Sequence, residues 1–293
     1  MPVPGRVVAC RLVDASEHVP PVTDAPPVPI RPGANRGARV AALPALLLVA
    51  IAVWEIIATR SQAASVPGDA AWARAAAIVR QGHRPGDLIV FAPEWADPIG
   101  RLHLGDLIPL EMAARMDAAR YARIWELSIR GASSRDTVGL VPVEIKQVHG
   151  IELRRYERVP AVVVADVRDK LVTARIEGSA RVELSEVGFE PHRCVLVVPS
   201  GKPVRITFGQ LPLGSELVGY VGLADVFTRR DNRDPGTLDV ELGGAVVAST
   251  TVGVDDGWVR FRVATQPGPA DVTFIARAPS AGRQICFAAE ARR

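Results

Sequence analysis

The sequence is poor in aromatic residues and in cysteine. Aromatic side chains make up 5 % of its 293 residues, and it has three cysteines. Its cores must therefore rest on Val, Leu, Ile and Ala, and two cysteines without a nearby histidine pair exclude a zinc site. The glycine patterns of dinucleotide-binding and P-loop proteins are absent, as is the GxSxG motif of hydrolases. We expect no cofactor.

An excess of one charge is also missing. The formal net charge is +3, and residues 60–293 hold 30 basic and 28 acidic groups, interspersed along the chain. Nucleic-acid binding thus lacks its main electrostatic driver, and we expect no nucleic-acid partner. Apolar residues make up 48 %, which is enough to build packed cores.

One long apolar run is present, at residues 40–59. It begins VAALPALLLVAIAVW and carries a single charge, Glu55, near its end. About 20 apolar residues are needed for a helix to cross the hydrocarbon core, so we expect a single-pass signal anchor here. Two alternatives remain open: a signal peptide cleaved near Ser61-Gln62-Ala63, and a buried helix of a soluble protein.

The charges around this run indicate its orientation. Arg31, Arg36 and Arg39 precede it closely, which favours a cytoplasmic N-terminus. We therefore expect the C-terminal domains to be extracytoplasmic, and periplasmic in a Gram-negative cell. Residues 1–39 are Pro-rich and have no periodicity, so they are predicted to form a disordered tail.

Residues 67–164 are predicted to form a small α/β domain with a partly parallel sheet. Apolar spacing predicts a helix over Asp69–Gly82, and a second helix is expected over Pro109–Tyr121. Leu88–Phe91 and 122–129 are typical of buried strands, and two more strands are expected at 141–147 and 150–156. Alternation of helices and strands requires at least one parallel strand pair.

The loop after the first strand holds the candidate catalytic residues Glu94, Asp97 and His103. Ligands gather beyond the carboxyl ends of parallel strands. Two carboxylates there would suit acid–base work, and Trp95 would stack on a sugar ring. Turn chemistry around Asp97-Pro98 is the structural alternative.

Three segments of this domain carry a resemblance to a known family. PGDLIVFAPEW (85–95), RIWELS (123–128) and HGIELRRYE (149–157) resemble the soluble tail of GT-C-class membrane glycosyltransferases of the dolichyl-phosphate-mannose type. Those enzymes carry their catalytic acids in a membrane body of many spans, whereas one span is present here. The resemblance therefore implies an accessory domain, and no catalytic residue is transferred.

Residues 168–293 change to a period of two, with turn residues between short runs. Residues 258–263 alternate cleanly, as in a half-buried antiparallel strand. About eight such runs predict a β-sandwich, jelly-roll-like, that is similar to noncatalytic carbohydrate-binding modules. That similarity implies exposed aromatic ligand-binding residues, for which Tyr220, Phe227 and Trp258 are the candidates, with core packing as the alternative.

Cys194 and Cys286 lie in the first long strand and the last strand of the sandwich. Such strands are neighbours in many jelly rolls, so an oxidising compartment would allow a disulfide; two buried free thiols are the alternative. Oxygen-bearing side chains crowd one segment, but their spacing fits no EF-hand loop, so no metal is expected. These residues are Asp225, Asp231, Asn232, Asp234 and Asp239.

Together these features predict a membrane-anchored protein of the cell envelope that is noncatalytic and binds glycan or an envelope protein through its sandwich. The alternative is a catalytic or accessory component of envelope glycosylation that uses the acidic loop after the first strand.

Overall fold

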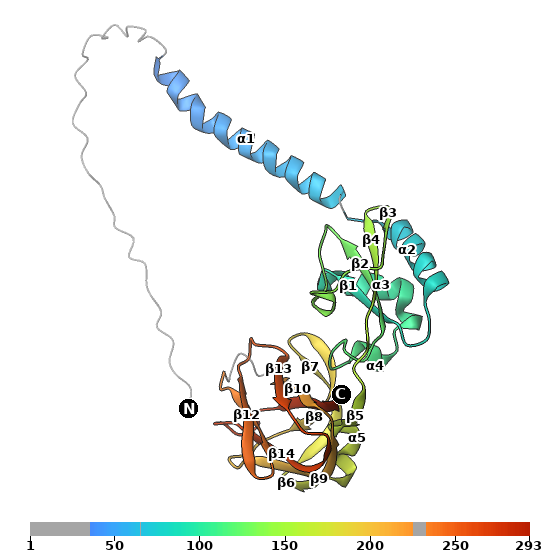
Figure 1. The fold of residues 1–293 in the computed structure, drawn as a ribbon. Coiled ribbons are helices and arrows are strands. Elements are labelled where there is room, and N and C mark those ends of the chain that lie inside the picture. The colour runs from blue at the N-terminus through green and yellow to red at the C-terminus, as the bar shows by residue number, and fades with distance from the viewer. Residues whose placement is uncertain (1–35, 65, 225–232) are drawn as a thin grey trace, which may run out of the picture. The chain divides into compact units, whose positions relative to one another are not determined.

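The computed structural model describes residues 36–64, 66–224 and 233–293. The predicted tail to residue 35, Cys10, Asp225, Phe227, Asp231 and Asn232 lie outside these ranges. Contacts divide the chain at Ala58 and Thr59 into two units. Each unit is therefore described by itself, and the second contains both the α/β part and the sandwich (Figure 1).

Helix α1 spans Arg36–Ala64, so residues 36–39 belong to it and not to the predicted tail. Its stretch Pro44–Ala63 has a mean hydropathy of 1.6 and is long and apolar enough to cross a bilayer, by length and composition. Pro44 lies inside this helix, which therefore lacks one backbone hydrogen bond there.

Helix α2, Asp69–Gly82, has the predicted bounds and buries Trp72 and Val79 against the first sheet. This sheet has the order β1-β2-β4-β3. Its strands are β1 Leu88–Ala92, β2 Arg123–Ile129, β3 Glu144–Val148 and β4 Ile151–Glu157. β1 pairs with β2 in parallel, which confirms the predicted parallel pair, and the other pairs are antiparallel.

The segment after β1 is helical, where the sequence predicted an irregular loop. It forms η1 (Glu94–Ala96) and α3 (Asp97–Leu104), with Pro98 in the first turn. Proline is tolerated there because the first amides of a helix have no intrahelical acceptor. Short turns follow, η2 (Gly105–Leu107) and α4 (Leu110–Ala113).

The predicted helix over Pro109–Tyr121 is wrong, because α4 ends at Ala113. Tertiary hydrogen bonds explain the difference. The carbonyl oxygens of Ala114, Arg115 and Met116 accept bonds from the sandwich. Their donors are the Arg193 amide, the His192 ring and the Trp258 ring. These carbonyls are thus used between layers and not along a helix.

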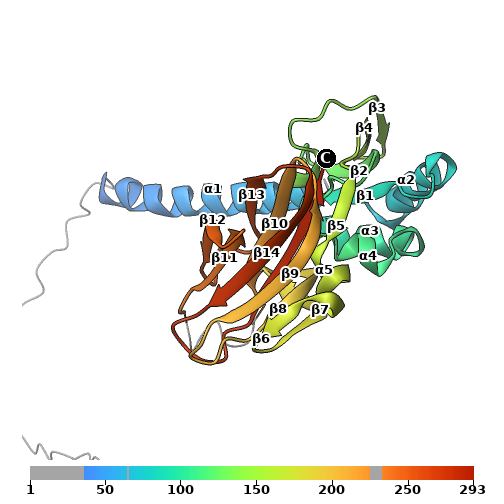
Figure 2. The ribbon, with the colours of Figure 1, turned by 60° about the horizontal axis from the view of Figure 1, so that its bottom comes forward.

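The remaining chain forms a sandwich of two antiparallel sheets, as the alternation predicted (Figure 2). The six-stranded sheet has the order β13-β10-β15-β8-β7, with β5 also paired to β15, and the five-stranded sheet has the order β12-β11-β14-β9-β6. Short turns α5 (Val167–Lys170) and η4 (Leu171–Thr173) follow β5. The strands are β5 Val163–Asp166, β6 Arg175–Glu177, β7 Ala180–Val187, β8 Glu190–Val197, β9 Val204–Leu213, β10 Glu216–Leu223, β11 Gly236–Leu242, β12 Ala245–Val252, β13 Val259–Ala264, β14 Gly268–Arg277 and β15 Ile285–Arg292.

The sandwich core lies between the two sheets. Phe274 of β14 packs against Phe287 of β15 with ring centroids 5.0 Å apart, and against Phe208 of β9 at 5.9 Å. On the outer face of the six-stranded sheet, a second apolar cluster contains Val187, Leu196 and both sandwich cysteines. Apolar side chains are therefore buried on both faces of the six-stranded sheet.

A group of charged side chains joins the α/β part to the sandwich. Its members are Asp117, Arg120, Asp166, Arg168, Glu290 and Arg292, called the charge network below. Arg292 donates to both carboxylate oxygens of Asp117 at 2.9 Å. Arg120 donates to Glu290 at 2.8 Å. Three guanidinium groups face three carboxylates, so the network buries no net charge.

Candidate functional site

A cleft of about 660 Å³ lies where the α/β part meets the sandwich. The α/β part lines it with η1, the start of α3 and the segments near residues 115 and 135. The sandwich lines it with the β7–β8 turn, His192, Tyr220 and Trp258. Ligand sites commonly form where two such parts meet.

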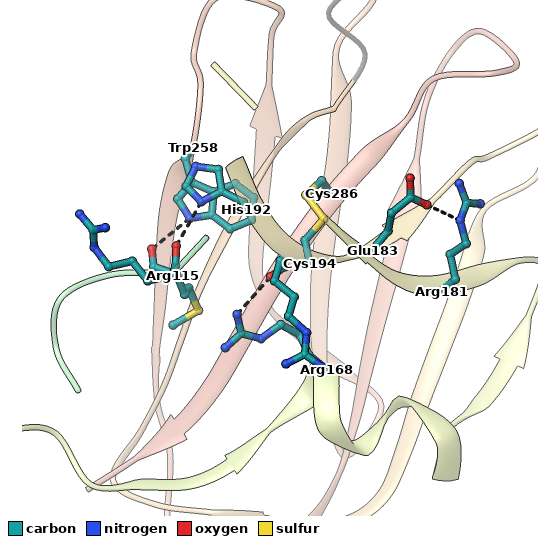
Figure 3. The surroundings of a disulfide bond; sticks show 10 residues. Arg115, Arg168, Arg181, Glu183, His192, Cys194, Trp258 and Cys286 are labelled. Atoms are coloured by element: carbon teal, nitrogen blue, oxygen red, sulfur yellow. Dashed lines mark hydrogen bonds and ion pairs between the residues drawn. A yellow bond between two sulfur atoms is a disulfide. The ribbon is translucent and has the colours of Figure 1, made fainter. Parts of the chain in front are cut away.

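The sandwich wall of the cleft is a stack of rings. The Trp258 ring lies 4.3 Å from the His192 ring and 5.9 Å from the Tyr220 ring, centroid to centroid, with planes 10° apart in both pairs. Trp258 Nε1 donates to the Met116 carbonyl at 3.2 Å. This bond satisfies the half-buried indole and ties the wall to the α/β part (Figure 3).

His192 is held as a neutral imidazole within this wall. It is 4 % exposed, and Nδ1 lies 3.2 Å from the Arg115 carbonyl oxygen, which can only accept, so Nδ1 carries the proton. Burial, with smaller effects from Arg135 and other arginines, lowers the pKa of His192 to about 4. Its Nε2 has no hydrogen-bond partner among the described residues and lies 3.7 Å from Glu190 Oε2.

Two exposed aromatic side chains stand at the cleft. Trp95 is 54 % exposed and Phe189 is 74 % exposed, and both line the cavity. Phe189 follows Gly188 in the β7–β8 turn, with φ values of +71° and +62°. Such a turn favours Asn and Gly, because a left-handed backbone costs a bulky residue about 1 kcal/mol. The turn thus holds an exposed phenyl ring against its backbone preference.

The polar lining mixes both signs of charge. Arg101 Nε donates to Asp97 at 2.5 Å, and Arg115 pairs with Asp136. Arg135 of the α/β part pairs with Glu190 of the sandwich, and its Nε lies 3.8 Å from Glu94. Glu94 and Arg135 remain more than half exposed. The cleft therefore offers hydrogen-bond donors and acceptors without a strong field of one sign.

Most of the predicted site residues meet in this one cleft. Glu94, Trp95 and Asp97 line it from the α/β part, and Tyr220 and Trp258 line it from the sandwich. His103 does not join them, because it lies further along α3 with Nε2 3.0 Å from Asp69. Of the three candidate catalytic residues, Glu94 and Asp97 therefore share the cleft, and His103 lies outside it.

Sequence reasoning missed His192 and Phe189. A single histidine within a strand gives no signal of its own. The Gly188-Phe189 pair between two alternating runs did mark a hairpin turn, and it was the available signal for Phe189. In the acid-rich segment, Asp239 accepts bonds from Ser249 and Arg277, so its oxygens are used within the sheet.

Cys194 and Cys286 form a disulfide beside the ring stack, with Cα atoms 5.6 Å apart (Figure 3). β8 and β15 are paired neighbours, with Cys286 opposite Leu196. The bond thus ties two adjacent strands on the outer face of the sheet.

No protein-family model matches the sequence, and no curated protein matches it. Solved structures resemble the fold. CBM51-2 in complex with GlcNAc, with INT domains, from Clostridium perfringens ZmpB shares 14 % identity, covering 54 % of this chain and 41 % of that one, with a TM-score of 0.34. Tandem CBM51 modules of a Streptococcus pneumoniae family 98 glycoside hydrolase share 11 %, covering 49 % and 56 %, at 0.32. CsCBM6-3 from Clostridium stercorarium in complex with cellobiose shares 14 %, covering 41 % and 87 %, at 0.27.

These similarities concern the arrangement of strands in carbohydrate-binding jelly rolls. The chain spans about two fifths of the length of the Clostridium perfringens structure. At these scores the likeness carries no argument about what this chain binds. The resemblance to GT-C glycosyltransferase tails finds no support in these comparisons and stays a prediction.

Proposed function

We propose that this protein is a membrane-anchored, noncatalytic binding protein whose cleft between the α/β part and the sandwich binds a glycan. The observation that carries the proposal is that aromatic side chains from both parts of the second unit meet on one cleft. Trp95 comes from one part of the second unit, and Phe189, Tyr220 and Trp258 come from the other.

The lining suits a sugar because it combines apolar faces with paired donors and acceptors. Exposed aromatic rings such as Trp95 and Phe189 gain free energy when an apolar sugar face covers them. Arginine donates to sugar hydroxyl groups and carboxylates accept from them, and Arg135 and Glu94 are exposed enough to do so. The mixed charge does not favour a polyanion such as nucleic acid.

The proposed location is the extracytoplasmic side of a membrane, with α1 as the anchor. The apolar stretch Pro44–Ala63 and the arginines before it support this orientation. A topology reporter fused after Arg293 tests it. Activity of a reporter that works only outside the cytoplasm is expected, and a cytoplasmic signal would overturn the orientation.

Binding is tested with the full chain in detergent on a glycan array, followed by titration of the best glycan. Trp95→Ala and Phe189→Ala remove exposed rings and should each weaken binding about tenfold, or about 1.4 kcal/mol. Leu102→Ala is the matched control, since Leu102 is 82 % exposed on α3 and does not line the cleft. Binding that survives both ring removals, or an array with no ligand, would refute the proposal.

A catalytic role in envelope glycosylation is the second candidate. It is favoured by one observation, that Glu94 and Asp97 both line the cleft. Glu94→Gln and Asp97→Asn should abolish glycosyl transfer or hydrolysis while leaving glycan binding measurable. An unchanged rate in both variants, with any glycosyl substrate that the protein turns over, would dismiss it.

A further inference from the structure

Another pocket, of about 650 Å³, lies on the α/β part and shares no lining residue with the cleft. The chain just after α1 lines it with Val66, Pro67, Gly68, Ala70 and Ala71, and the other lining residues are Arg74, Arg130, His149 and Gly150. Every charged or titratable residue in this lining is basic. The set is called the basic pocket below.

Three separate elements bring these basic residues together. Arg74 lies on α2, Arg130 follows β2, and His149 lies in the β3–β4 turn. Arg130 and His149 have φ values of +56° and +47°. Left-handed backbone is uncommon for such residues, so both turns hold their basic side chains in conformations that glycine would adopt more easily.

The two arginines of the basic pocket have no acidic partner in the described part of the second unit. Within residues 66–224 and 233–293, Arg74 and Arg130 make no ion pair. Arg74 Nη1 donates to His149 Nε2, and Arg130 Nη2 donates to the Gln62 carbonyl at 2.8 Å. Asp69, the acidic residue at the start of α2, does not pair with these arginines; its Oδ1 lies 3.0 Å from His103 Nε2. Arg130 Cζ also lies over the Trp95 ring, 5.8 Å from the ring centroid. Each guanidinium has five N–H donors, so both arginines keep donors for an anion.

The chain places the basic pocket close to the end of the apolar helix. Val66 is three residues beyond Ala63, where the apolar stretch ends. A chain spans at most about 3.6 Å per residue, so these two residues are at most about 11 Å apart. The headgroup layer begins where the hydrocarbon core ends, so the basic pocket is within its reach.

We propose that the basic pocket binds the phosphate of an anionic phospholipid headgroup in the leaflet where α1 ends. Arginine suits this ligand because its planar fork of N–H donors matches phosphate oxygens. The inference rests on the membrane anchor of the proposed function and not on its glycan site. Lipid held there would fix the distance of the α/β part from the bilayer surface.

Native mass spectrometry of the full chain in neutral detergent tests this proposal. Phosphatidylglycerol and phosphatidylcholine are titrated separately, and inorganic phosphate forms a third arm. We expect one retained phosphatidylglycerol per chain and weaker retention of phosphatidylcholine. Because each arginine near anionic headgroups contributes about fivefold, Arg74→Gln/Arg130→Gln should weaken phosphatidylglycerol binding by about 25-fold.

The matched control is Lys170→Gln/Lys202→Gln, which removes the same charge from exposed positions outside the basic pocket. It should bind phosphatidylglycerol like the wild type. Equal binding by Arg74→Gln/Arg130→Gln and wild type, no preference over phosphatidylcholine, or binding of inorganic phosphate without the lipid would overturn the proposal. Carbonate extraction reports loss of the anchor separately. Because Arg130 contacts Trp95, the glycan affinity of Arg74→Gln/Arg130→Gln is measured as well, and the lipid affinity of Phe189→Ala is measured beside it, so the failures are distinguishable.

Discussion

Glu290→Gln probes the charge network that holds the α/β part on the sandwich. Glu290 is 1 % exposed. It accepts hydrogen bonds from Arg292 at 2.9 Å, Arg120 at 2.8 Å and Arg168 at 3.2 Å. Glutamine has nearly the same volume, so the change makes no cavity. The change leaves three guanidinium groups facing two carboxylates. It also places the glutamine NH2 group, a donor, next to guanidinium N–H groups that can only donate.

Breaking a buried pair on one side costs about 3–5 kcal/mol, because the remaining charge stays desolvated. For a unit of this size, that loss corresponds to a fall in Tm of about 6–20 °C. Urea unfolding followed by tryptophan fluorescence at pH 7 measures it, with the midpoint expected to fall at an unchanged m-value.

Glu183→Gln is the control for this measurement. Glu183 pairs with Arg181 on the edge strand β7, and its side chain is 40 % exposed (Figure 3). Exposed pairs contribute under about 1 kcal/mol, so this variant should unfold almost like the wild type. If Glu290→Gln also falls within about 1 kcal/mol of the wild type, the charge network does not hold the two parts together.

The double variant Glu290→Gln/Arg168→Gln restores the charge balance and should recover part of the lost stability. Failure to recover any of it would assign the loss to hydrogen-bond geometry and not to charge. Acid should act on the same network. Burial tends to raise the pKa of Asp117, but the hydrogen bonds and charge of Arg292 outweigh it and lower that pKa. The stability that the Asp117 carboxylate contributes is therefore present above its unfolded pKa, near 3.9, and is lost as pH falls through its folded pKa.

Three further predictions concern the sandwich. The pKa of His192 lies at about 4 in the folded protein and at about 6.5 in the unfolded chain, so wild-type stability should fall by about 3 kcal/mol as pH drops from 6.5 to 4. Urea titrations at several pH values measure this fall, and His192→Phe should not show it. A fall that persists in His192→Phe would assign it to another group. Cys194 and Cys286 are 92 residues apart, so reduction of their disulfide should lower the free energy of unfolding by about 4–5 kcal/mol in the chain-entropy model. A thiol reagent should label neither cysteine in the folded, unreduced protein, and labelling of either would contradict the bond. Phe189→Gly should remove the steric cost of the left-handed backbone and stabilise the fold by up to about 1 kcal/mol, while weakening glycan binding. Higher stability together with tighter glycan binding would argue against a binding role for the Phe189 ring.

Local patterns predicted the elements that local forces determine. The helix Asp69–Gly82 was placed with its observed bounds, because its apolar spacing matches one buried face and Gly82 precedes the turn. β12, Ala245–Val252, is also set by a local signal, since Gly243 and Gly244 adopt the positive φ values of a hairpin turn before it. Both signals act within a few residues of the element that they define.

Contacts between distant residues could not be predicted in this way. The segment after Pro109 has helical propensity, but three of its carbonyls bond to the sandwich and the helix stops at Ala113. Arg292 and Asp117 are separated by 175 residues, and no local pattern specifies that they pair. The convergence of Trp95 with Trp258 on one cleft follows from that same docking. The sequence therefore named residues of the site without indicating that they belong together.

The origin of the cleft in two parts of the chain leads to a last prediction. A sandwich that bound glycan by itself would keep its affinity when the docking is weakened. If the cleft of both parts binds, ligand must favour the docked state, so Glu290→Gln should bind more weakly than the wild type. Saturating glycan, at about 100 times its Kd, should return about 2.7 kcal/mol of stability to either protein. Unchanged affinity in Glu290→Gln, together with a clear loss of stability, would assign the ligand to the sandwich alone and exclude Trp95 from the site.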